Sequence, residues 1–373
     1  MPFKALLLRL HRWVGLTVAV LVVLQGLSGT AIAFRHELNR LIHHDALVVA
    51  PPASLAPLAA IAAAGKAAFP DRRLTRIDTP VTRDDAYLVR LETPAGAIAY
   101  AAVDPSTAKV TRQGPLAAWP VEWLYQLHMS LLSGDTGERI VGFTGLGLLF
   151  MALTGPFVWW PGGLARVGRA LSVDFKAGVG RGARDLHRLG GLLAAPVLLV
   201  SATTGVLMAW QPWLSPTVNL VAPVVETKAP KAAPGKCAQK HTLDEAVAAA
   251  AQRHPGQTLK SVRFPGKGGK VVAVYFRSLG TPDPRATDHV WVDACSAVVL
   301  REKGALSEPA GSRFFSGLLW IHTGQWLGTF GRVLVLLAAA TATGLGVTGF
   351  VQWAARTADL RRRRAAKAAK ATA

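Results

Sequence analysis

Four long runs without a charged residue interrupt the chain, and each is apolar enough to form a membrane helix. They are Trp13–Phe34, Ile140–Ala165, Leu189–Val225 and Val333–Ala355. About 20 apolar residues span a bilayer as an α-helix, so every run is long enough, and the third continues as an apolar extension beyond Pro212. The pattern therefore predicts an α-helical membrane protein with four transmembrane helices.

Two long segments between these runs carry a different pattern. Each begins with an Ala-rich helical stretch and continues with β-type runs that Pro, Gly and Asp separate as turns. The helical stretches are Leu55–Phe69 and Leu243–His254, and the strands are expected at Tyr87–Glu92, Ile98–Asp104, Val271–Arg277 and His289–Val299. One helix followed by strands is typical of a small α+β module, so each segment is expected to hold one. Aromatic-rich segments then lead back to the membrane and predict interfacial helices at Trp119–Leu132 and Phe314–Leu327.

The two halves of the chain resemble each other at fixed offsets. Ser28-Gly29 corresponds to Thr204-Gly205 and Thr154-Gly155 corresponds to Thr348-Gly349, with histidines repeated beside them. We therefore expect two tandem repeats of span, outside module and span, oriented the same way in the membrane. The expected segments are a first transmembrane helix (1–36), a first module (37–118), an interfacial helix with the second transmembrane helix (119–165), a cytoplasmic loop (166–186), a third transmembrane helix (187–211), a second module (212–312), an interfacial helix with the fourth transmembrane helix (313–356) and a basic tail (357–373).

The distribution of charge predicts the orientation. The chain has 42 Lys and Arg residues against 22 Asp and Glu residues, and most of this basic excess lies in the N-terminal segment, the loop 166–186 and the tail 357–373. Basic loops stay in the cytoplasm, so both termini are expected there and both modules in the bacterial periplasm. The basic excess is thus a topology signal, and a soluble enzyme or a nucleic-acid-binding protein is excluded. Residues 1–33 also resemble a secretory signal, but their 22-residue apolar run favours a retained span.

Four of the ten histidines occupy repeated positions beside the membrane. His11 and His187 lie at the cytoplasmic ends of the first and third spans, and His128 and His322 lie on the expected interfacial helices. A histidine at a membrane edge commonly has only a packing role, but four at duplicated positions favour a shared function. Facing imidazoles are what an axially ligated haem iron requires. The sequence therefore predicts two haems, with His11 paired with His187 and His128 paired with His322.

The remaining candidates are less decisive. No Cys-x-x-Cys-His occurs, which excludes covalent attachment and leaves haem b. Cys237 and Cys295 lie in the second outside segment, where an oxidising compartment favours a disulfide over two free thiols. His36 lies just outside the first span beside other polar residues, either in a solvated stretch or near a substrate or metal. The Gly, Ser and Thr residues of the spans fit close helix packing and a gap for a flat macrocycle equally well.

Several of these motifs together resemble the PepSY-associated transmembrane family over residues 5–356. They are Leu10-His11-Arg12-Trp13-Val14-Gly15, Ser28-Gly29, Leu127-His128, Thr154-Gly155 with Trp159-Trp160-Pro161, and Asp185-Leu186-His187-Arg188. The family includes iron-regulated inner-membrane proteins of the ferrioxamine reductase type, which bind haem b and reduce ferric siderophores in the periplasm. The resemblance implies haem ligation by His11, His187, His128 and His322, and PepSY domains in the outside segments.

We therefore expect an inner-membrane electron-transfer protein that reduces a ferric siderophore at the periplasmic face, with a quinol or a cytoplasmic reductase as electron donor. Reduction releases the metal, because oxygen donors hold Fe²⁺ less tightly than Fe³⁺. The alternative is a non-catalytic envelope protein whose PepSY modules bind or regulate periplasmic peptidases. No phosphate-binding loop or dinucleotide fingerprint supports ATP or a bound nicotinamide.

Overall fold

A computed structural model of the chain describes residues 3–174, 176, 178–225, 229–231, 241–265 and 270–371. The chain divides into two compact units. The helical unit comprises residues 1–33, 124–214 and 318–373, and the sheet unit comprises residues 34–123 and 215–317.

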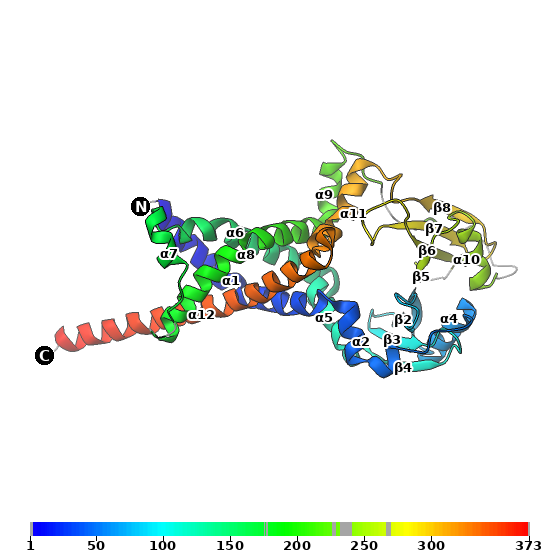
Figure 1. The fold of residues 1–373 in the computed structure, drawn as a ribbon, viewed down its shortest axis with the longest axis horizontal. Coiled ribbons are helices and arrows are strands. Elements are labelled where there is room, and N and C mark those ends of the chain that lie inside the picture. The colour runs from blue at the N-terminus through cyan, green and yellow to red at the C-terminus, as the bar shows by residue number, and fades with distance from the viewer. Residues whose placement is uncertain are drawn as a thin grey trace. The chain divides into compact units, whose positions relative to one another are not determined.

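The helical unit is built from four long helices, α1 (Phe3–Ile32), α6 (Gly134–Trp159), α8 (Val179–Ala209) and α12 (Gly328–Ala371). Each is long and apolar enough to cross a membrane, which confirms the four spans expected from the hydrophobic pattern. Helix α1 packs against α6 and α12, and α8 packs against the same two helices (Figure 1). Helices α1 and α8 therefore occupy one diagonal of a four-helix bundle.

Small residues fill the centre of this bundle. Its buried core is formed by Val22, Ala152, Ala194, Leu198, Ala338 and Ala342. Alanine and glycine let helix backbones approach closely, and close packing provides much of the attraction between helices in lipid. The helices are therefore near enough for side chains of one to contact the backbone of the next.

Two helix boundaries differ from the hydrophobic pattern for local reasons. Helix α8 begins at Val179, inside the expected loop 166–186, directly after Gly178, whose φ of 88° is open to glycine. It ends at Ala209, and the apolar extension forms the separate helix α9 (Gln211–Val218), with Pro212 in its first turn. The loop itself holds two short helices, η2 (Leu164–Arg166) and α7 (Val167–Ala170).

The sheet unit contains one antiparallel sheet of eight strands in the order β4-β3-β2-β1-β5-β6-β7-β8. Pairing of β1 with β5, with Ile77 opposite Val262, joins the two halves. The strands are β1 (Arg73–Asp78), β2 (Tyr87–Glu92), β3 (Ile98–Val103), β4 (Val110–Pro115), β5 (Leu259–Arg263), β6 (Val271–Arg277), β7 (Thr287–Asp293) and β8 (Val299–Lys303). Helices α4 (Leu58–Ala68) and α10 (Leu243–Ala251) lie beside the strands (Figure 1). Both helices share one apolar core with the sheet, so the two expected modules share a sheet and a core.

The expected strand His289–Val299 is interrupted in the structure. Asp293 ends β7, and its carboxylate accepts hydrogen bonds from the backbone N–H groups of Cys295 and Ser296. Ala297 follows with a φ of 53°, which completes a tight turn before β8 begins at Val299. The apolar residues after the turn thus belong to a second strand.

Shorter helices complete the described residues. They are α2 (Arg35–Ile42), α3 (His44–Leu47), η1 (Leu116–Ala118), α5 (Pro120–Ser130), α11 (Ala310–His322) and η3 (Gln325–Leu327). Helix α5 lies within the first segment expected to be an interfacial helix, whereas α11 begins at Ala310, before the second expected segment, and ends inside it; the two helices carry His128 and His322.

Candidate functional site

Two of the predicted histidines face each other in the helical unit. His128 on α5 and His322 on α11 have ring centroids 6.3 Å apart, with an angle of 57° between the ring planes. Both side chains are partly buried. The structure therefore brings together two residues that are almost two hundred positions apart in sequence, as the repeat predicts for this pair.

The other two histidines lie near the opposite end of the bundle. His11 is in the third turn of α1 and His187 is in the third turn of α8, the helices of one diagonal. The two side chains are near enough for their charges to interact. Ser28 follows His11 by 17 residues (28 − 11) on α1, and Thr204 follows His187 by 17 residues (204 − 187) on α8. At 1.5 Å per residue, this places the two histidine levels about 26 Å apart along the helices.

A hydroxyl group on a different helix contacts the Nδ1 atom of each histidine. Three of these hydroxyls belong to threonine and one to serine. The pairs and their N–O distances are His11 with Thr154 (2.7 Å), His128 with Ser28 (3.1 Å), His187 with Thr348 (3.1 Å) and His322 with Thr204 (3.0 Å). The same ring atom is used in all four pairs, so the Nε2 atoms are on the other side of each ring.

The residue after each hydroxyl is a glycine that lies against the imidazole ring. A Cβ atom added to the glycine would lie 3.2 Å from His128 Cε1 at Gly29, 3.8 Å from His11 Cε1 at Gly155, 3.3 Å from His322 Cε1 at Gly205 and 3.4 Å from His187 Cε1 at Gly349. Each Ser/Thr-Gly dipeptide therefore contacts one imidazole ring and fixes its position. The hydroxyl holds the ring edge and the glycine leaves room for the ring.

The spacing of His128 and His322 would allow both imidazoles to hold one metal ion. Metal–imidazole bonds are about 2 Å long and a ring nitrogen lies about 1 Å from the ring centre, so imidazoles on opposite sides of one ion have centroids about 6 Å apart. The centroid distance of 6.3 Å between His128 and His322 agrees with this value. Imidazole ligands also commonly donate their second ring N–H to a fixed acceptor, as the hydroxyl contacts permit here.

The hydroxyl residues are the functional candidates that sequence reasoning missed. Ser28, Thr154, Thr204 and Thr348 were recognisable as members of repeated Ser/Thr-Gly dipeptides, but small residues in spans are ordinary features of helix packing. The useful signal was that each dipeptide repeats together with a histidine. Only the fold shows which dipeptide contacts which histidine, because the partners are on different helices.

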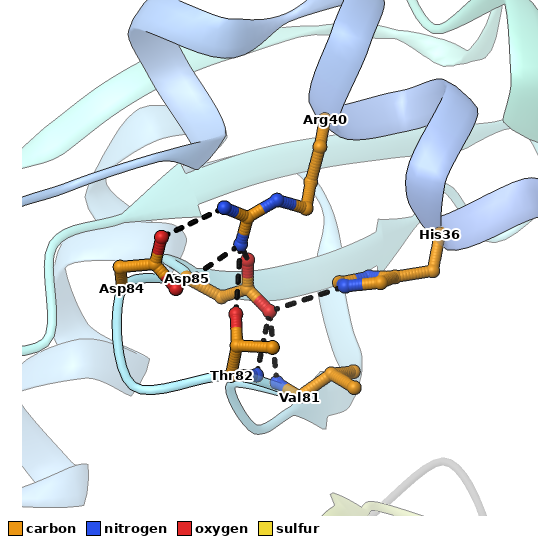
Figure 2. Close-up of polar contacts among 6 residues, drawn as sticks. All are labelled: His36, Arg40, Val81, Thr82, Asp84 and Asp85. Atoms are coloured by element: carbon orange, nitrogen blue, oxygen red, sulfur yellow. Dashed lines mark hydrogen bonds and ion pairs between the residues drawn. The ribbon is translucent and has the colours of Figure 1, made fainter.

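His36 is placed in the sheet unit, at the start of α2 (Figure 2). Its Nε2 atom lies 3.5 Å from the carboxylate of Asp85, which is nearly buried. Arg40 forms ion pairs with Asp84 and Asp85, and the Asp85 carboxylate also accepts the backbone N–H groups of Val81 and Thr82 (Figure 2). The imidazole of His36 is partly exposed and is oriented by a carboxylate that is itself held firmly in place.

The two other histidines near His36 in the sequence, His43 and His44, differ in their exposure to solvent. His43 is buried and makes an edge contact with Trp119, with ring centroids 5.0 Å apart, whereas the His44 side chain is 71% exposed. Across the part of the chain that the structure describes, no three or more His, Cys, Asp or Glu side chains converge as a candidate metal cluster. The candidate ligands among these residues are thus the facing pair His128 and His322, together with His11 and His187 at the other level.

The predicted disulfide cannot be placed in full. Cys295 lies in the turn after β7 and its thiol is not free. Cys237 lies outside the described residues, so the pairing of the two cysteines stays a prediction.

A buried carboxylate stabilises the first half of the sheet unit. Glu122 accepts hydrogen bonds from Arg35, including one of 2.9 Å from Nε, and one of 2.9 Å from Asn39 Nδ2. Burial raises the pKa of Glu122, whereas the positive charge of Arg35 and the hydrogen bonds from Arg35 and Asn39 lower it. The net effect is a pKa below the ordinary value of a glutamate. Glu122 is therefore ionised in the folded protein at neutral pH.

A half-buried histidine lies on β7, in the second half of the sheet. His289 stacks on Tyr275 with ring centroids 3.7 Å apart, and its Nε2 atom lies 2.9 Å from Thr287 Oγ1. Burial, together with the positive charges of Lys303 and Arg263, lowers the pKa of His289 to about 3. His289 is therefore neutral in the folded protein over most of the accessible pH range.

Comparison with known proteins gives one family match. A family model described as the PepSY-associated TM region matches residues 8–356, which is nearly the whole chain. No curated protein matches the chain. The family match covers all four spanning helices, both histidine levels and the sheet unit.

Proposed function

The chain belongs to the PepSY-associated transmembrane family, and from this premise we propose that it is a haem b electron-transfer protein that reduces a ferric siderophore at the periplasmic face of a bacterial inner membrane. The observation that carries the proposal is that His128 and His322 face each other, and that a hydroxyl on another helix contacts Nδ1 of these two histidines and also of His11 and His187. Its iron-reducing part rests on the family resemblance.

Haem is the cofactor that these residues suit. His11 and His187 would hold one haem and His128 and His322 a second, in agreement with the 6.3 Å spacing of the latter pair. When bound, haem iron supplies a one-electron centre that alternates between Fe³⁺ and Fe²⁺. The protein holds the imidazoles at fixed positions, and the apolar bundle around them keeps bulk water away. The absence of Cys-x-x-Cys-His favours non-covalent haem b.

The substrate would be iron held by a siderophore. Oxygen donors bind Fe³⁺ tightly because the ion is small and highly charged, and one electron converts it to Fe²⁺, which they hold weakly. The chain would thus release iron without cleaving the chelator. A quinol or a cytoplasmic reductase is the proposed source of the electron.

The distribution of basic residues supports an orientation of the helical bundle in the membrane. We also propose that the chain consists of two tandem repeats with the same orientation. Both chain ends lie at one end of the bundle (Figure 1), with Arg9 and Arg12 near the start of α1 and a run of arginines at 361–364 of α12. Basic segments remain in the cytoplasm. We therefore assign the His11–His187 level to the cytoplasmic side and the His128–His322 level to the periplasmic side.

One experiment tests the cofactor and the reaction together. The full-length protein, purified in detergent after growth with ample haem precursor, is expected to show a haem b absorption spectrum that changes with dithionite, and about two haems per chain. The reduced protein should be reoxidised by a ferric hydroxamate, with Fe²⁺ trapped by a ferrous chelator. Reoxidation by ferricyanide is the positive control.

Two outcomes would contradict the proposal. A colourless protein would refute the assignment of haem as the cofactor. It would favour the alternative function, in which the chain is a PepSY envelope protein that binds or regulates periplasmic peptidases. The protein could instead be red and be reoxidised by ferricyanide but not by excess ferric siderophore. This result would refute the reductase assignment and leave the haem assignment intact. The His44→Ala variant is a matched control, because His44 is exposed and should affect neither result.

A further inference from the structure

The hydroxyls that contact the four histidines donate their hydrogen atoms to backbone carbonyls and not to the imidazoles. Each donates to the carbonyl oxygen four residues earlier in its own helix. The bonds are Ser28 to Leu24 (2.7 Å), Thr154 to Phe150 (2.8 Å), Thr204 to Val200 (2.7 Å) and Thr348 to Gly344 (2.6 Å). A hydroxyl has one hydrogen atom to donate and two lone pairs that accept. Toward the imidazole, these oxygens therefore act as acceptors.

This arrangement decides which ring nitrogen carries the hydrogen. An accepting hydroxyl requires an N–H at Nδ1, and a neutral imidazole with a hydrogen at Nδ1 has its lone pair at Nε2. We propose that Ser28, Thr154, Thr204 and Thr348 are positioning residues that fix all four histidines in the Nδ1–H tautomer and thereby present Nε2 as the ligating atom. The statement about ligation rests on the proposed function, whereas the tautomer does not.

A second acceptor supports the assignment independently at His128. Its Nδ1 atom also lies 3.2 Å from the backbone carbonyl oxygen of Gln25, which has no hydrogen to donate. A carbonyl accepts from Nδ1 only when Nδ1 carries the hydrogen, so both acceptors at His128 require the same tautomer.

The hydrogen bond also affects the bond that Nε2 would make. An acceptor at Nδ1–H draws the hydrogen away and makes Nε2 a stronger electron donor, and removal of such a partner commonly weakens metal binding about 10- to 100-fold. A stronger donor favours the ferric over the ferrous state. Loss of a hydroxyl should therefore weaken cofactor binding at that histidine pair and raise the midpoint potential there.

The test uses Thr204, the partner of His322, in the full-length protein in detergent. Thr204→Val keeps the branched shape and removes the hydroxyl, and Thr204→Ser keeps the hydroxyl. Thr341→Val on α12 is the control, because the Thr341 hydroxyl contacts the Leu337 carbonyl of its own helix. Thr348→Val, at His187, provides a second variant if Thr204→Val fails to fold.

The first measurement needs no cofactor. In haem-free protein with ¹⁵N-labelled histidine, NMR is expected to show the Nδ1–H tautomer for His322, and Thr204→Val should shift this residue toward a mixture of tautomers. The second measurement is made with haem bound. Thr204→Val should lower haem affinity about 10-fold or more at one of two sites and raise that site's midpoint potential, whereas Thr204→Ser and Thr341→Val should match the wild type.

Each result separates the two proposals. An Nδ1 lone pair at His322 in the haem-free protein overturns the inference even if haem binds. Equal affinity and potential in Thr204→Val and the wild type overturn it too, and so does an equal loss in Thr204→Ser, which would indicate packing. A wild-type protein that binds no haem refutes the proposed function, and the NMR spectrum still decides the tautomer.

Discussion

The imidazole rings of His128 and His322 face each other with centroids 6.3 Å apart, and each ring is supported from behind by a different spanning helix. Ser28 and Gly29 of α1 contact His128, whereas Thr204 and Gly205 of α8 contact His322. The short helices α5 and α11 thus carry the two histidines, and the diagonal helices α1 and α8 contact them. The spacing of the pair depends on the packing of the whole bundle.

Removing one histidine from each level tests the pairing. The His187→Ala variant should lose the haem held with His11 and retain the other, because His128 and His322 have separate partners. His322→Ala should do the reverse. Haem extraction and redox titration should give about one haem per chain for either variant, with different midpoint potentials for what remains. Loss of both haems in either variant would contradict the pairing or show that the bundle no longer folds.

The glycines beside the histidines should differ in their tolerance of a methyl group. In Gly29→Ala the new Cβ would lie 3.2 Å from His128 Cε1, whereas in Gly155→Ala it would lie 3.8 Å from His11 Cε1. The first contact is tight enough to displace the ring and the second is an ordinary van der Waals contact. We expect Gly29→Ala to lose haem at the His128–His322 pair and Gly155→Ala to retain both haems, as measured by the haem-to-protein ratio. Equal loss in both variants would contradict this explanation.

The sequence was sufficient to predict the four spans, because bilayer thickness sets the length of an apolar run and lipid excludes charge. The strands β2 and β6 were also predicted, since their residues are mostly apolar and bounded by turn residues. Strand β4 was missed because Thr111, Arg112 and Gln113 give it a polar, edge-strand pattern. The pairing of β1 with β5 is a contact between distant segments that periodicity does not encode.

The candidate site was predicted in part for a related reason. The four histidines stood out because they occur beside matching short motifs in the two halves of the sequence. The hydroxyl that holds each one lies on another helix, from 100 residues away for Ser28 and His128 to 161 residues away for His187 and Thr348. Such contacts depend on which helices are neighbours in the bundle, and hydrophobic patterns specify an apolar face without naming its partner.

The buried Glu122 should be important for the stability of the sheet unit. Glu122→Gln keeps the side-chain shape but removes the buried negative charge that accepts hydrogen bonds from Arg35 and Asn39, which should cost about 2 kcal/mol of unfolding free energy. Hydrogen exchange followed by mass spectrometry should show faster exchange in β2 and β3. Asp359→Asn is the control, because Asp359 and Arg363 form an exposed ion pair of the kind that contributes about 0–1 kcal/mol. Unchanged exchange in Glu122→Gln would contradict the prediction.

The stability of the sheet unit should fall as the pH is lowered, because of His289. Its pKa is lowered to about 3 in the folded protein, by burial first and then by Lys303 and Arg263, whereas an unfolded histidine titrates near 6.5. Between these values the unfolded chain binds a proton that the folded chain does not, so the free energy of unfolding decreases as the pH falls below about 6.5 and continues to decrease until about pH 3. For one such group the loss between pH 8 and pH 5 is about 2 kcal/mol.

The His289→Phe variant isolates this contribution. Phenylalanine keeps a planar ring to stack on Tyr275, which lies 3.7 Å from the His289 ring centroid, and it cannot take up a proton. Urea unfolding of the full-length protein in detergent, followed by the loss of β-structure in circular dichroism, should give a smaller decrease in stability between pH 8 and pH 5 for the variant. Other histidines and the carboxylates titrate equally in both proteins, so the difference between the two pH profiles reports His289. Identical profiles would show that His289 takes up its proton in the folded state as readily as in the unfolded chain, and a neutral imidazole at this position of the folded protein would then be excluded.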